Sequence, residues 1–334
     1  MANAEPGEQA ALIADHLRRM TEIADGNTAS DGCHSIGEIA FRTLDELDKG
    51  KSERRLPTGF TELDNVLSGG FRTGTLSIIA ARPSVGKTAL MTQIAANIAK
   101  KKIPVLVLTL EMTEQEIFKR VYHQQTNFSW PPAKIATGSE TVQEIFGWQM
   151  TVTEKSATIE TIETLAARYR RKDEKERIEV VFIDYVGLIR PAKNQEKMAV
   201  FERLEEIAGR LKELAKREKI AVILLSQRNR ESETKFKASL SDLRGSGGLE
   251  QAADVVLALV RNEESKPENV TLSILKNRDG MTGEIPFYYN GPRFRFQEIV
   301  TPPEASVKTS ATPAEGDDHA NKWAELSTGN EDEF

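Results

Sequence analysis

The sequence predicts an α/β domain with a mostly parallel central sheet, helices on both faces and antiparallel strands at one edge. Three observations support this prediction. Short apolar runs rich in β-branched residues alternate with helical periods between residues 76 and 296, which is typical of a parallel sheet covered on both faces. The early runs are almost wholly apolar, as doubly covered strands are. The last runs follow one another without helices between them, which predicts antiparallel pairing.

Each element of this domain is placed by its own pattern. The β-rich runs predict strands at 76–81, 105–110, 180–183, 221–226, 255–260, 270–275 and 285–289. Helical spacing of apolar residues predicts helices at 88–101, 113–127, 159–175 and 200–218. With short flanks, these elements place the domain at residues 56–300.

Two short segments precede the domain. Residues 1–30 contain one amphipathic helix and then a polar, flexible stretch. Residues 31–55 contain a second helix that starts at Ser35, where Glu38 completes a capping-box pattern. A helix this short does not bury its apolar stripe alone. Packing on its own domain and packing on a neighbouring copy both stay open.

The charge of the chain is concentrated at its end. The formal net charge is -6, and residues 301–334 hold eight acidic residues and two lysines. The preceding 300 residues are therefore neutral overall and free to carry local basic patches. The tail is rich in Pro, Ser, Thr and acidic residues, a composition that predicts disorder.

The composition also narrows the class of protein. No apolar run approaches the ~18 residues of a membrane span, and no signal-peptide pattern is present. Cys33 is the only cysteine, so the chain forms no internal disulfide. We expect a cytoplasmic protein that does not act on a membrane.

A phosphate-binding loop lies between the first predicted strand and helix of the domain. The sequence Ala-Arg-Pro-Ser-Val-Gly-Lys-Thr at 81–88 fits the P-loop pattern, except that Ala81 stands in place of the first glycine. The N–H groups of the loop and the helix N-terminus favour a phosphate. We expect Lys87 to reach the β- and γ-phosphates and Thr88 to bind Mg²⁺. The predicted ATP-binding residues are Arg82, Pro83, Ser84, Val85, Gly86, Lys87, Thr88 and Ala89.

Two carboxylates follow other predicted strands and are candidates for the same site. Asp184 ends a fully apolar run, and we expect it to hold the Mg²⁺ shell, with a helix N-cap as the alternative. Glu111 follows the run at 105–110. Strand ends meet at one mouth of a parallel sheet, so Glu111 is placed to orient and deprotonate the attacking water. The alternative is that it merely precedes the next helix.

Seven ordered blocks of the sequence resemble the DnaB family of hexameric replicative helicases. They lie at 58–64, 80–89, 110–112, 183–185, 225–230, 240–254 and 276–283. The resemblance extends from about Leu56 to Phe296. It implies a RecA-like P-loop NTPase fold and six copies in a ring, with ATP at each subunit boundary. The implied activity is ATP-dependent unwinding of DNA with 5′ to 3′ movement on single-stranded DNA.

The resemblance also implies roles for residues of this chain. Glu111 is the expected catalytic base, Asp184 the Mg²⁺-shell aspartate and Gln227 the sensor of the γ-phosphate. Lys276 and Arg278 are expected to reach into the neighbouring copy's site, where a cation supplied in trans neutralises the transferring phosphoryl group. Two ordinary surface cations are the alternative. The implied DNA-contacting residues are Arg228, Arg230, Arg244, Gly245, Ser246 and Gly247, which suit sequence-tolerant phosphate contacts.

The chain departs from the family at its front, where it has too little sequence for the helical domain that helps recruit primase. Coupling to primase or to a helicase loader is therefore open. The acidic end closed by Phe334 resembles the tip of bacterial single-stranded-DNA-binding proteins. Docking on a replication partner and a merely solvated tail both stay open. The rival functions are a RecA-like recombinase and a regulatory ATPase partner of another helicase.

Overall fold

The computed structural model describes residues 36–48, 54–126, 140–155, 157–171, 173, 176–191, 198–228, 238–240, 246–261 and 268–299. The chain divides into a body of residues 1–298 and a C-terminal unit of residues 299–334. The predicted helix in residues 1–30, the capping pair Ser35 and Glu38 and the acidic tail fall outside what can be described.

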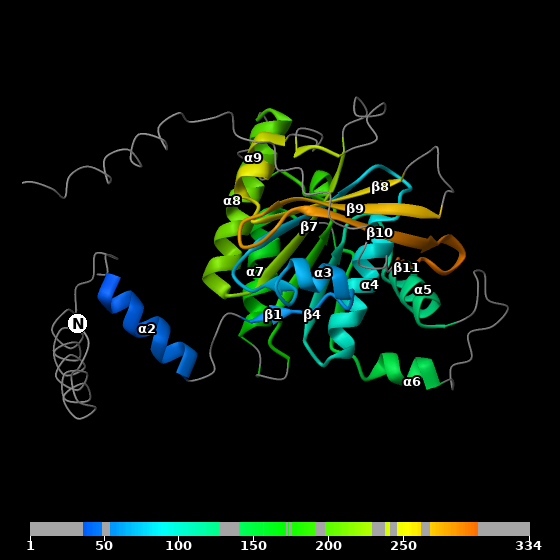
Figure 1. The fold of residues 1–334 in the computed structure, drawn as a ribbon, viewed down its shortest axis with the longest axis horizontal. Helices are drawn as coiled ribbons and strands as arrows, with labels where there is room; N and C mark the ends of the chain where they lie inside the picture. The colour runs from blue at the N-terminus through cyan, green and yellow to red at the C-terminus, as the bar shows by residue number, and fades with distance from the viewer. Residues whose placement is uncertain are drawn as a thin grey trace, which may run out of the picture. The chain divides into compact units, whose positions relative to one another are not determined.

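A mixed sheet, nine-stranded over the described residues, forms the centre of the body (Figure 1). Its strand order is β11-β10-β9-β8-β3-β7-β6-β4-β5. The strands are β3 (Leu76–Ala81), β4 (Val105–Thr109), β5 (Met150–Thr153), β6 (Val180–Asp184), β7 (Ala221–Gln227), β8 (Val255–Arg261), β9 (Asn269–Asn277), β10 (Gly283–Asn290) and β11 (Arg295–Glu298). The six strands from β8 to β5 are parallel, and β8 to β11 pair antiparallel. The predicted sheet with its antiparallel edge is confirmed.

Alternate side chains of β3 pack into two separate apolar layers. Ile79 belongs to the layer that contains Leu90 of α4 (Lys87–Lys100). Ile78 belongs to the layer that contains Leu211 of α8 (Val200–Glu218). All six residues of β3 are buried, because helices cover both faces of the sheet. The end of β3, where the phosphate loop starts, is thus fixed from two sides.

The helices follow the predicted pattern, except that the helix predicted at 159–175 ends at Arg170. α4 carries buried residues around most of its circumference, and α8 buries one stripe that includes Leu204, Ile207 and Leu214. α7 (Ile159–Arg170) lies on the same face of the sheet as α8. α5 (Glu114–Gln125) begins with a capping box between Thr113 and Glu116. The hydrogen bond that the backbone N–H of Thr113 donates to the Glu116 carboxylate lowers the pKa of this carboxyl below its ordinary value.

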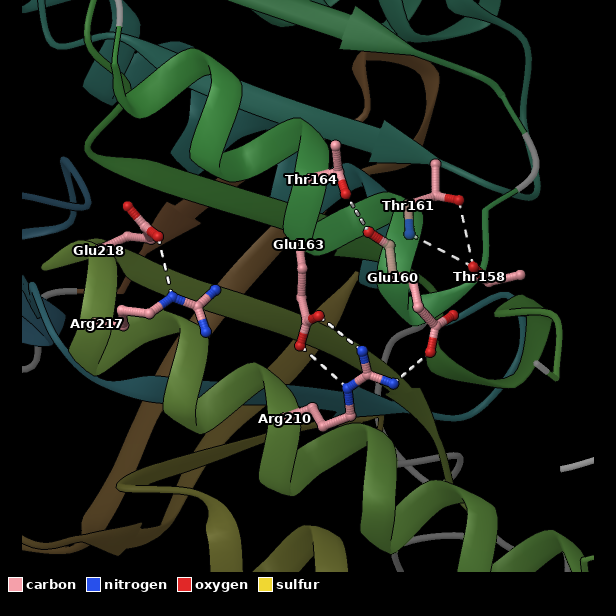
Figure 2. A network of polar contacts seen from close by, with 8 residues as sticks. All are labelled: Thr158, Glu160, Thr161, Glu163, Thr164, Arg210, Arg217 and Glu218. Atoms are coloured by element: carbon pink, nitrogen blue, oxygen red, sulfur yellow. Dashed lines mark hydrogen bonds and ion pairs between the residues drawn. The ribbon is translucent and has the colours of Figure 1, made fainter. Parts of the chain in front are cut away.

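Arg210 of α8 connects that helix to α7 (Figure 2). Its Nε and Nη2 donate to the two carboxylate oxygens of Glu163, at 3.1 and 2.7 Å. Its Nη1 donates to Glu160 on the same face of α7. These bonds from Glu163 and Glu160 raise the pKa of Arg210, and the paired carboxylates hold α7 against α8.

Several short elements were not predicted. They are β1 (Arg55–Leu56), β2 (Phe71–Arg72), α3 (Thr61–Val66), α6 (Glu140–Phe146), β5, the turn η1 (Val186–Leu188), α9 (Ser246–Ala252), the turn η4 (Gly291–Arg293) and β11. Each has only two to seven residues, too few for periodicity to show. Pairing with a neighbouring strand stabilises the short strands, as β5 pairs with β4 and β11 with β10.

A helix is found where the second helix was predicted, as α2 (Ile36–Asp48). Its described apolar side chains are exposed, with Ile36 at 81% and Leu44 at 61% of full exposure. Among the described residues, no helix has the length and apolar character that crossing a membrane requires.

Candidate nucleotide-binding site

The phosphate loop lies between β3 and α4, as the sequence predicts. Gly86 is the N-cap of α4, with a φ of 110° and no side chain to accept a hydrogen bond from the first helical N–H groups. These N–H groups favour an anion. A Cβ on Gly86 would lie 2.9 Å from Cζ of Phe296, so this position requires glycine. Ala81, by contrast, is a buried residue at the end of β3, and its methyl group fills the core where glycine would leave a space.

Lys87, Thr88 and Asp184 meet at the start of α4. Thr88 Oγ1 donates to Oδ2 of Asp184 at 2.6 Å, and Lys87 Nζ lies 3.2 Å from Oδ1 of Asp184. Lys87 Nζ also lies 4.4 Å from the ring centre of Tyr185. Asp184 does not cap the turn that follows, whose N-cap is Tyr185. The predicted grouping of Lys87, Thr88 and Asp184 is therefore present.

The oxygen atoms at this point suit Mg²⁺. Asp184 is fully buried, and its Oδ1 faces the Lys87 ammonium at 3.2 Å. A buried carboxylate oxygen favours a nearby cation, and hydroxyl and carboxylate oxygens are ligands of the kind Mg²⁺ prefers. The described residues hold no cluster of three or more His, Cys, Asp or Glu that could enclose a metal. Thr88 and Asp184 thus fit an ion that takes most of its ligands from phosphate and water.

Glu111 lies at the same end of the sheet. The N–H of Leu110 donates to the carbonyl of Asp184 at 2.7 Å, which holds the segment after β4 beside the end of β6. Glu111 is exposed and lines a cavity of about 400 Å³ together with Lys87 and Thr88. The cap of α5 is Thr113, so Glu111 has no capping role in that helix. A carboxylate open to the cavity can accept a proton from a water molecule there.

Gln227 lines the cavity from β7, the strand between β3 and β6. It is the last residue of β7 and is aligned with Ala81 of β3. The next residue's N–H, that of Arg228, donates to the carbonyl of Ala81 at 3.1 Å. The backbone on both sides of Gln227 is therefore fixed to the strand that carries the phosphate loop.

One wall of the cavity was not predicted from the sequence. It is formed by Arg120 of α5, Tyr289 of β10 and Phe294. The guanidinium of Arg120 lies 5.2 Å from the ring centre of Phe294, and Tyr289 stacks on Phe296 with 4.4 Å between ring centres. Burial raises the pKa of the Tyr289 hydroxyl, which keeps it neutral. Flat rings and a guanidinium beside a phosphate loop suit a nucleotide base.

Two buried glutamines hold this wall. Gln93 of α4 exchanges two hydrogen bonds with the backbone of Phe296, at 2.9 and 2.7 Å. Gln124 of α5 donates to the carbonyls of Phe294 and Ala89, at 2.9 and 2.8 Å. Gln124 and Phe294 are 170 residues apart in the chain, and Gln93 and Phe296 are 203 residues apart. Sequence spacing therefore does not reveal these bonds. The one local signal is an amide at buried helix positions.

Lys276 and Arg278 lie at the other end of the sheet. Arg278 follows β9, and its N–H donates to the carbonyl of Asp254, which precedes β8. Asp254 in turn is bonded to Leu76, the first residue of β3. The phosphate loop follows the last residue of β3. These two cations are therefore not brought together with the predicted phosphate-binding residues of the same chain.

The predicted DNA-contacting residues are only partly described. Arg230, Arg244 and Gly245 lie outside the described residues, and so does the side chain of Ser246, the first residue of α9. Gly247 is exposed and has open space around it. Arg228 is only 5% exposed, which argues against its predicted phosphate contact. The hydrogen bond from its backbone N–H to the carbonyl of Ala81 keeps the residue alongside the buried end of β3.

The chain is similar to known proteins over most of its length. Residues 55–298 match the family model described as the DnaB-like helicase C terminal domain. The chain is 32% identical to replicative DNA helicase DnaB of Geobacillus stearothermophilus, over 88% of this chain and 70% of that protein. It is 29% identical to replicative DNA helicase DnaC of Bacillus subtilis, over 82% and 64%. It is 32% identical to a probable plasmid replicative DNA helicase of Chlamydia muridarum, over 73% and 55%.

Solved structures show the same similarity. A structure described as an ATPase domain superposes with a TM-score of 0.71 and 30% identity, over 80% of this chain and all of that one. A DnaB-like replicative helicase studied with primase superposes with a TM-score of 0.68 and 30% identity, over 85% of this chain and 71% of that one. The chain thus spans between 55% and 70% of the length of the three curated relatives.

Proposed function

Because the chain belongs to the family of DnaB-like helicase C-terminal domains, we propose that it is an ATP-dependent DNA helicase of the replicative type. It works as a ring of copies, with six as the expected number. It binds ATP and Mg²⁺ between neighbouring copies and moves on single-stranded DNA in the 5′ to 3′ direction. The competing functions are a recombinase-type filament and a regulatory ATPase.

The observation that carries this proposal is that the phosphate-binding residues and the candidate trans arginine lie at opposite ends of one sheet. Lys87, Thr88 and Asp184 lie at the C-terminal ends of the parallel strands, and Arg278 is linked through Asp254 to the first residue of β3. Leu76 and Ala81 are the two ends of β3, so the length of the strand alone separates them by about 16 Å. Arg278 does not reach its own chain's phosphates. A second copy that places its Arg278 at these phosphates accounts for both the phosphate-binding residues and the distant arginine.

The hydrolysis reaction assigns a task to each residue. Lys87 and the N–H groups of the loop hold the β- and γ-phosphates. Glu111 orients a water molecule, whose oxygen bonds to the γ-phosphorus while its proton passes to the Glu111 carboxylate. The bond from the γ-phosphorus to the bridging oxygen breaks, and the leaving group is ADP. Thr88 and Asp184 would hold Mg²⁺, which would supply positive charge to the phosphates.

The neighbouring copy completes the site. Its Arg278 and Lys276 neutralise the charge that develops on the transferring phosphoryl group, and a trans arginine is typically worth ~10³-fold or more in rate. Gln227 contacts the γ-phosphate and precedes the chain segment that holds Arg230. The conformation of the DNA-contacting segment, which includes Arg244, Gly245, Ser246 and Gly247, thereby depends on whether the γ-phosphate is present. Such contacts are sensitive to salt and tolerant of sequence.

Ring closure involves α2. Its exposed Ile36, Ile39 and Leu44 share one helical face, which is apolar surface that a monomer leaves in water. A neighbouring copy is the proposed occupant. A helicase loader or primase is a further proposed partner, supported by the structural neighbour studied with primase. The acidic tail is a second proposed docking segment for replication proteins.

Unwinding of forked DNA tests the proposal. The substrates are two forks that differ only in whether the single-stranded tail ends 5′ or 3′. We expect ATP-dependent strand separation on the 5′-tailed fork, its loss in Lys87→Ala, and wild-type activity in Lys101→Ala, an exposed lysine at the far end of α4. Electron microscopy with ATP should show closed rings. Filaments would favour the recombinase function. ATP turnover without separation of either fork would favour the regulatory ATPase.

A further inference from the structure

We propose that Asp254 is a positioning residue for the two cations that act in trans. It holds Arg278 at the surface of the body and connects it to the first residue of the strand that ends at the phosphate loop. This inference rests on the proposed function, because it concerns the orientation of Arg278 toward a neighbouring copy. It gives a task to a buried charge that the nucleotide pocket does not use.

Asp254 bonds to three separate parts of the body. Its Oδ2 accepts from the N–H of Leu76 at 2.9 Å and from Nζ of Lys212 in α8. Its Oδ1 lies 3.6 Å from Nη1 of Arg278. Its backbone donates to the carbonyl of Leu76 at 2.8 Å and accepts from the N–H of Arg278 at 3.0 Å. Asp254 is 2% exposed, so its charge is screened little from the largely buried Lys212 and more from Arg278, whose side chain is 52% exposed.

The end of helix α9 holds the same two cations. Arg278 Nη2 donates to the carbonyl of Gln251 at 3.1 Å, and Lys276 Nζ donates to the carbonyl of Glu250 at 2.6 Å. The last carbonyls of a helix lack partners within the helix and attract cations. Burial, and secondly the charge of Arg278, lower the pKa of Lys276. The helix carbonyls and Asp254 therefore offset the repulsion between the two like charges.

The exposure of Arg278 indicates what this arrangement does. A purely structural carboxylate would be satisfied by Lys212 and the N–H of Leu76. Asp254 also directs its second oxygen at Arg278, whose side chain remains 52% exposed. An exposed arginine samples many rotamers unless its neighbours restrict it. Here the restraint comes from a group bonded to the start of β3, so the orientation of Arg278 is tied to the strand that carries its own chain's phosphate loop.

Asp254→Asn tests the inference, because the amide oxygen still accepts from Leu76 while the charge is lost. We expect the ATP affinity of the variant to stay within about threefold of wild type, since no pocket residue changes. We expect its ATP turnover to fall roughly 10- to 100-fold, as misplacement of a catalytic group by about 1 Å does. Asp279→Asn is the matched control, because Asp279 adjoins Arg278 but pairs with Arg72. It should behave as wild type.

Mixing of variants separates positioning from damage to the fold. A Lys87→Ala copy lacks a working phosphate loop but keeps Arg278 and Asp254. In a 1:1 mixture with Asp254→Asn, about a quarter of the interfaces combine an intact loop with an intact trans arginine. Turnover should then rise several-fold above that of either variant alone. A mixture of Asp254→Asn with Arg278→Ala should show no such rise, because neither copy supplies an oriented arginine.

The outcomes distinguish this inference from the proposed function. If Lys87→Ala mixed with Arg278→Ala recovers no turnover, the shared site itself is refuted. If that pair recovers but Asp254→Asn turns over like wild type alone, or fails to recover with Lys87→Ala, the positioning role is overturned. Should Asp254→Asn fail to fold, Asp254→Glu keeps the charge, displaces it and is tested in the same mixtures.

Discussion

The hydroxyl of Thr88 donates a 2.6 Å hydrogen bond to Oδ2 of Asp184, a residue 96 positions later in the chain. The bond joins the helix of the phosphate loop to the end of β6, and β7 lies between β6 and β3 in the sheet. Lys87 approaches the other oxygen of the same carboxylate. The oxygen ligands proposed for Mg²⁺ are thus held together by the fold itself, and such preorganisation avoids reorganisation during the reaction.

Asp184→Asn should therefore weaken the activation of ATP turnover by Mg²⁺. The amide still accepts from Thr88 but no longer carries the charge that orients the metal's shell. We expect the Mg²⁺ concentration for half-maximal turnover to rise roughly 10- to 100-fold. The measurement is a Mg²⁺ titration of turnover at saturating ATP. Asp173→Asn, an exposed aspartate before β6, is the control. An unchanged Mg²⁺ titration would rule out Asp184 as part of the metal site.

The strongly periodic parts of the fold could be predicted from the sequence. β3 and α8 match their predicted bounds residue for residue, because apolar side chains at regular spacing determine both. The phosphate loop and Asp184 could be found because each adjoins such an element. The grouping at one strand end then follows from the parallel direction of the strands.

The aromatic wall and the burial of Arg228 could not be predicted in this way. Phe294 follows a three-residue turn, and its place over the pocket depends on bonds from Gln124 that span 170 residues. Arg228 follows β7 directly, and only the tertiary structure shows that its side chain turns inward. Local pattern identifies elements, whereas contacts between distant segments decide which side chains face the pocket.

Gly86→Ala should weaken nucleotide binding as well as the fold. The φ of 110° disfavours any side chain, and the new Cβ would meet Phe296 at 2.9 Å. We expect a loss of about 1–2 kcal/mol in the free energy of unfolding. We also expect at least tenfold weaker ATP binding, because the displaced Phe296 ring stacks on Tyr289, which belongs to the wall of the pocket. Calorimetric melting and ATP titration measure the two effects.

Gly74→Ala provides the matched comparison for Gly86→Ala. Gly74 has a similar positive φ of 79°, but a Cβ there meets no atom within 4 Å. It should lower stability by about 1 kcal/mol through backbone strain alone and leave ATP affinity unchanged. Equal losses of affinity in the two variants would contradict the proposed contact between the glycine and the aromatic wall.

Arg210→Met should loosen α7 from α8 and lower the free energy of unfolding by about 1 kcal/mol. Arg217→Met, in the neighbouring exposed pair of Figure 2, should cost less than about 0.5 kcal/mol. Urea denaturation of both variants measures the difference. A loss for Arg217→Met as large as that for Arg210→Met would contradict the role of Arg210 in holding the two helices together.

The contribution of Arg210 should also depend on pH. Its hydrogen bond lowers the pKa of Glu160 below the ordinary value of 4.5. The stabilisation is therefore complete above pH 4.5 and is lost as the pH falls through the lowered pKa, because the unfolded state takes up the proton first. The stability difference between wild type and Arg210→Met should shrink at acidic pH. A difference that stays constant there would assign the effect of Arg210 to packing of its stem.

Gln227→Ala should separate basal ATP turnover from its stimulation by single-stranded DNA. Gln227 lines the nucleotide cavity, and the backbone of Arg228 fixes it to the end of β3. It is thus the last pocket residue before the segment that holds Arg230. Loss of one hydrogen bond to a charged phosphate costs about 1.5–3 kcal/mol, so we expect the stimulated rate to fall roughly 10- to 100-fold. ATP affinity should change by less than about threefold, because Lys87 and the loop N–H groups remain.

Turnover measured against DNA concentration tests the role of Gln227, with Gln143→Ala on the exposed face of α6 as control. The control removes an amide of the same size from a helix that does not line the nucleotide cavity, so its basal and stimulated rates should both match wild type. If Gln227→Ala lowered basal and stimulated turnover by the same factor, Gln227 would act in binding alone and would not connect the γ-phosphate to DNA.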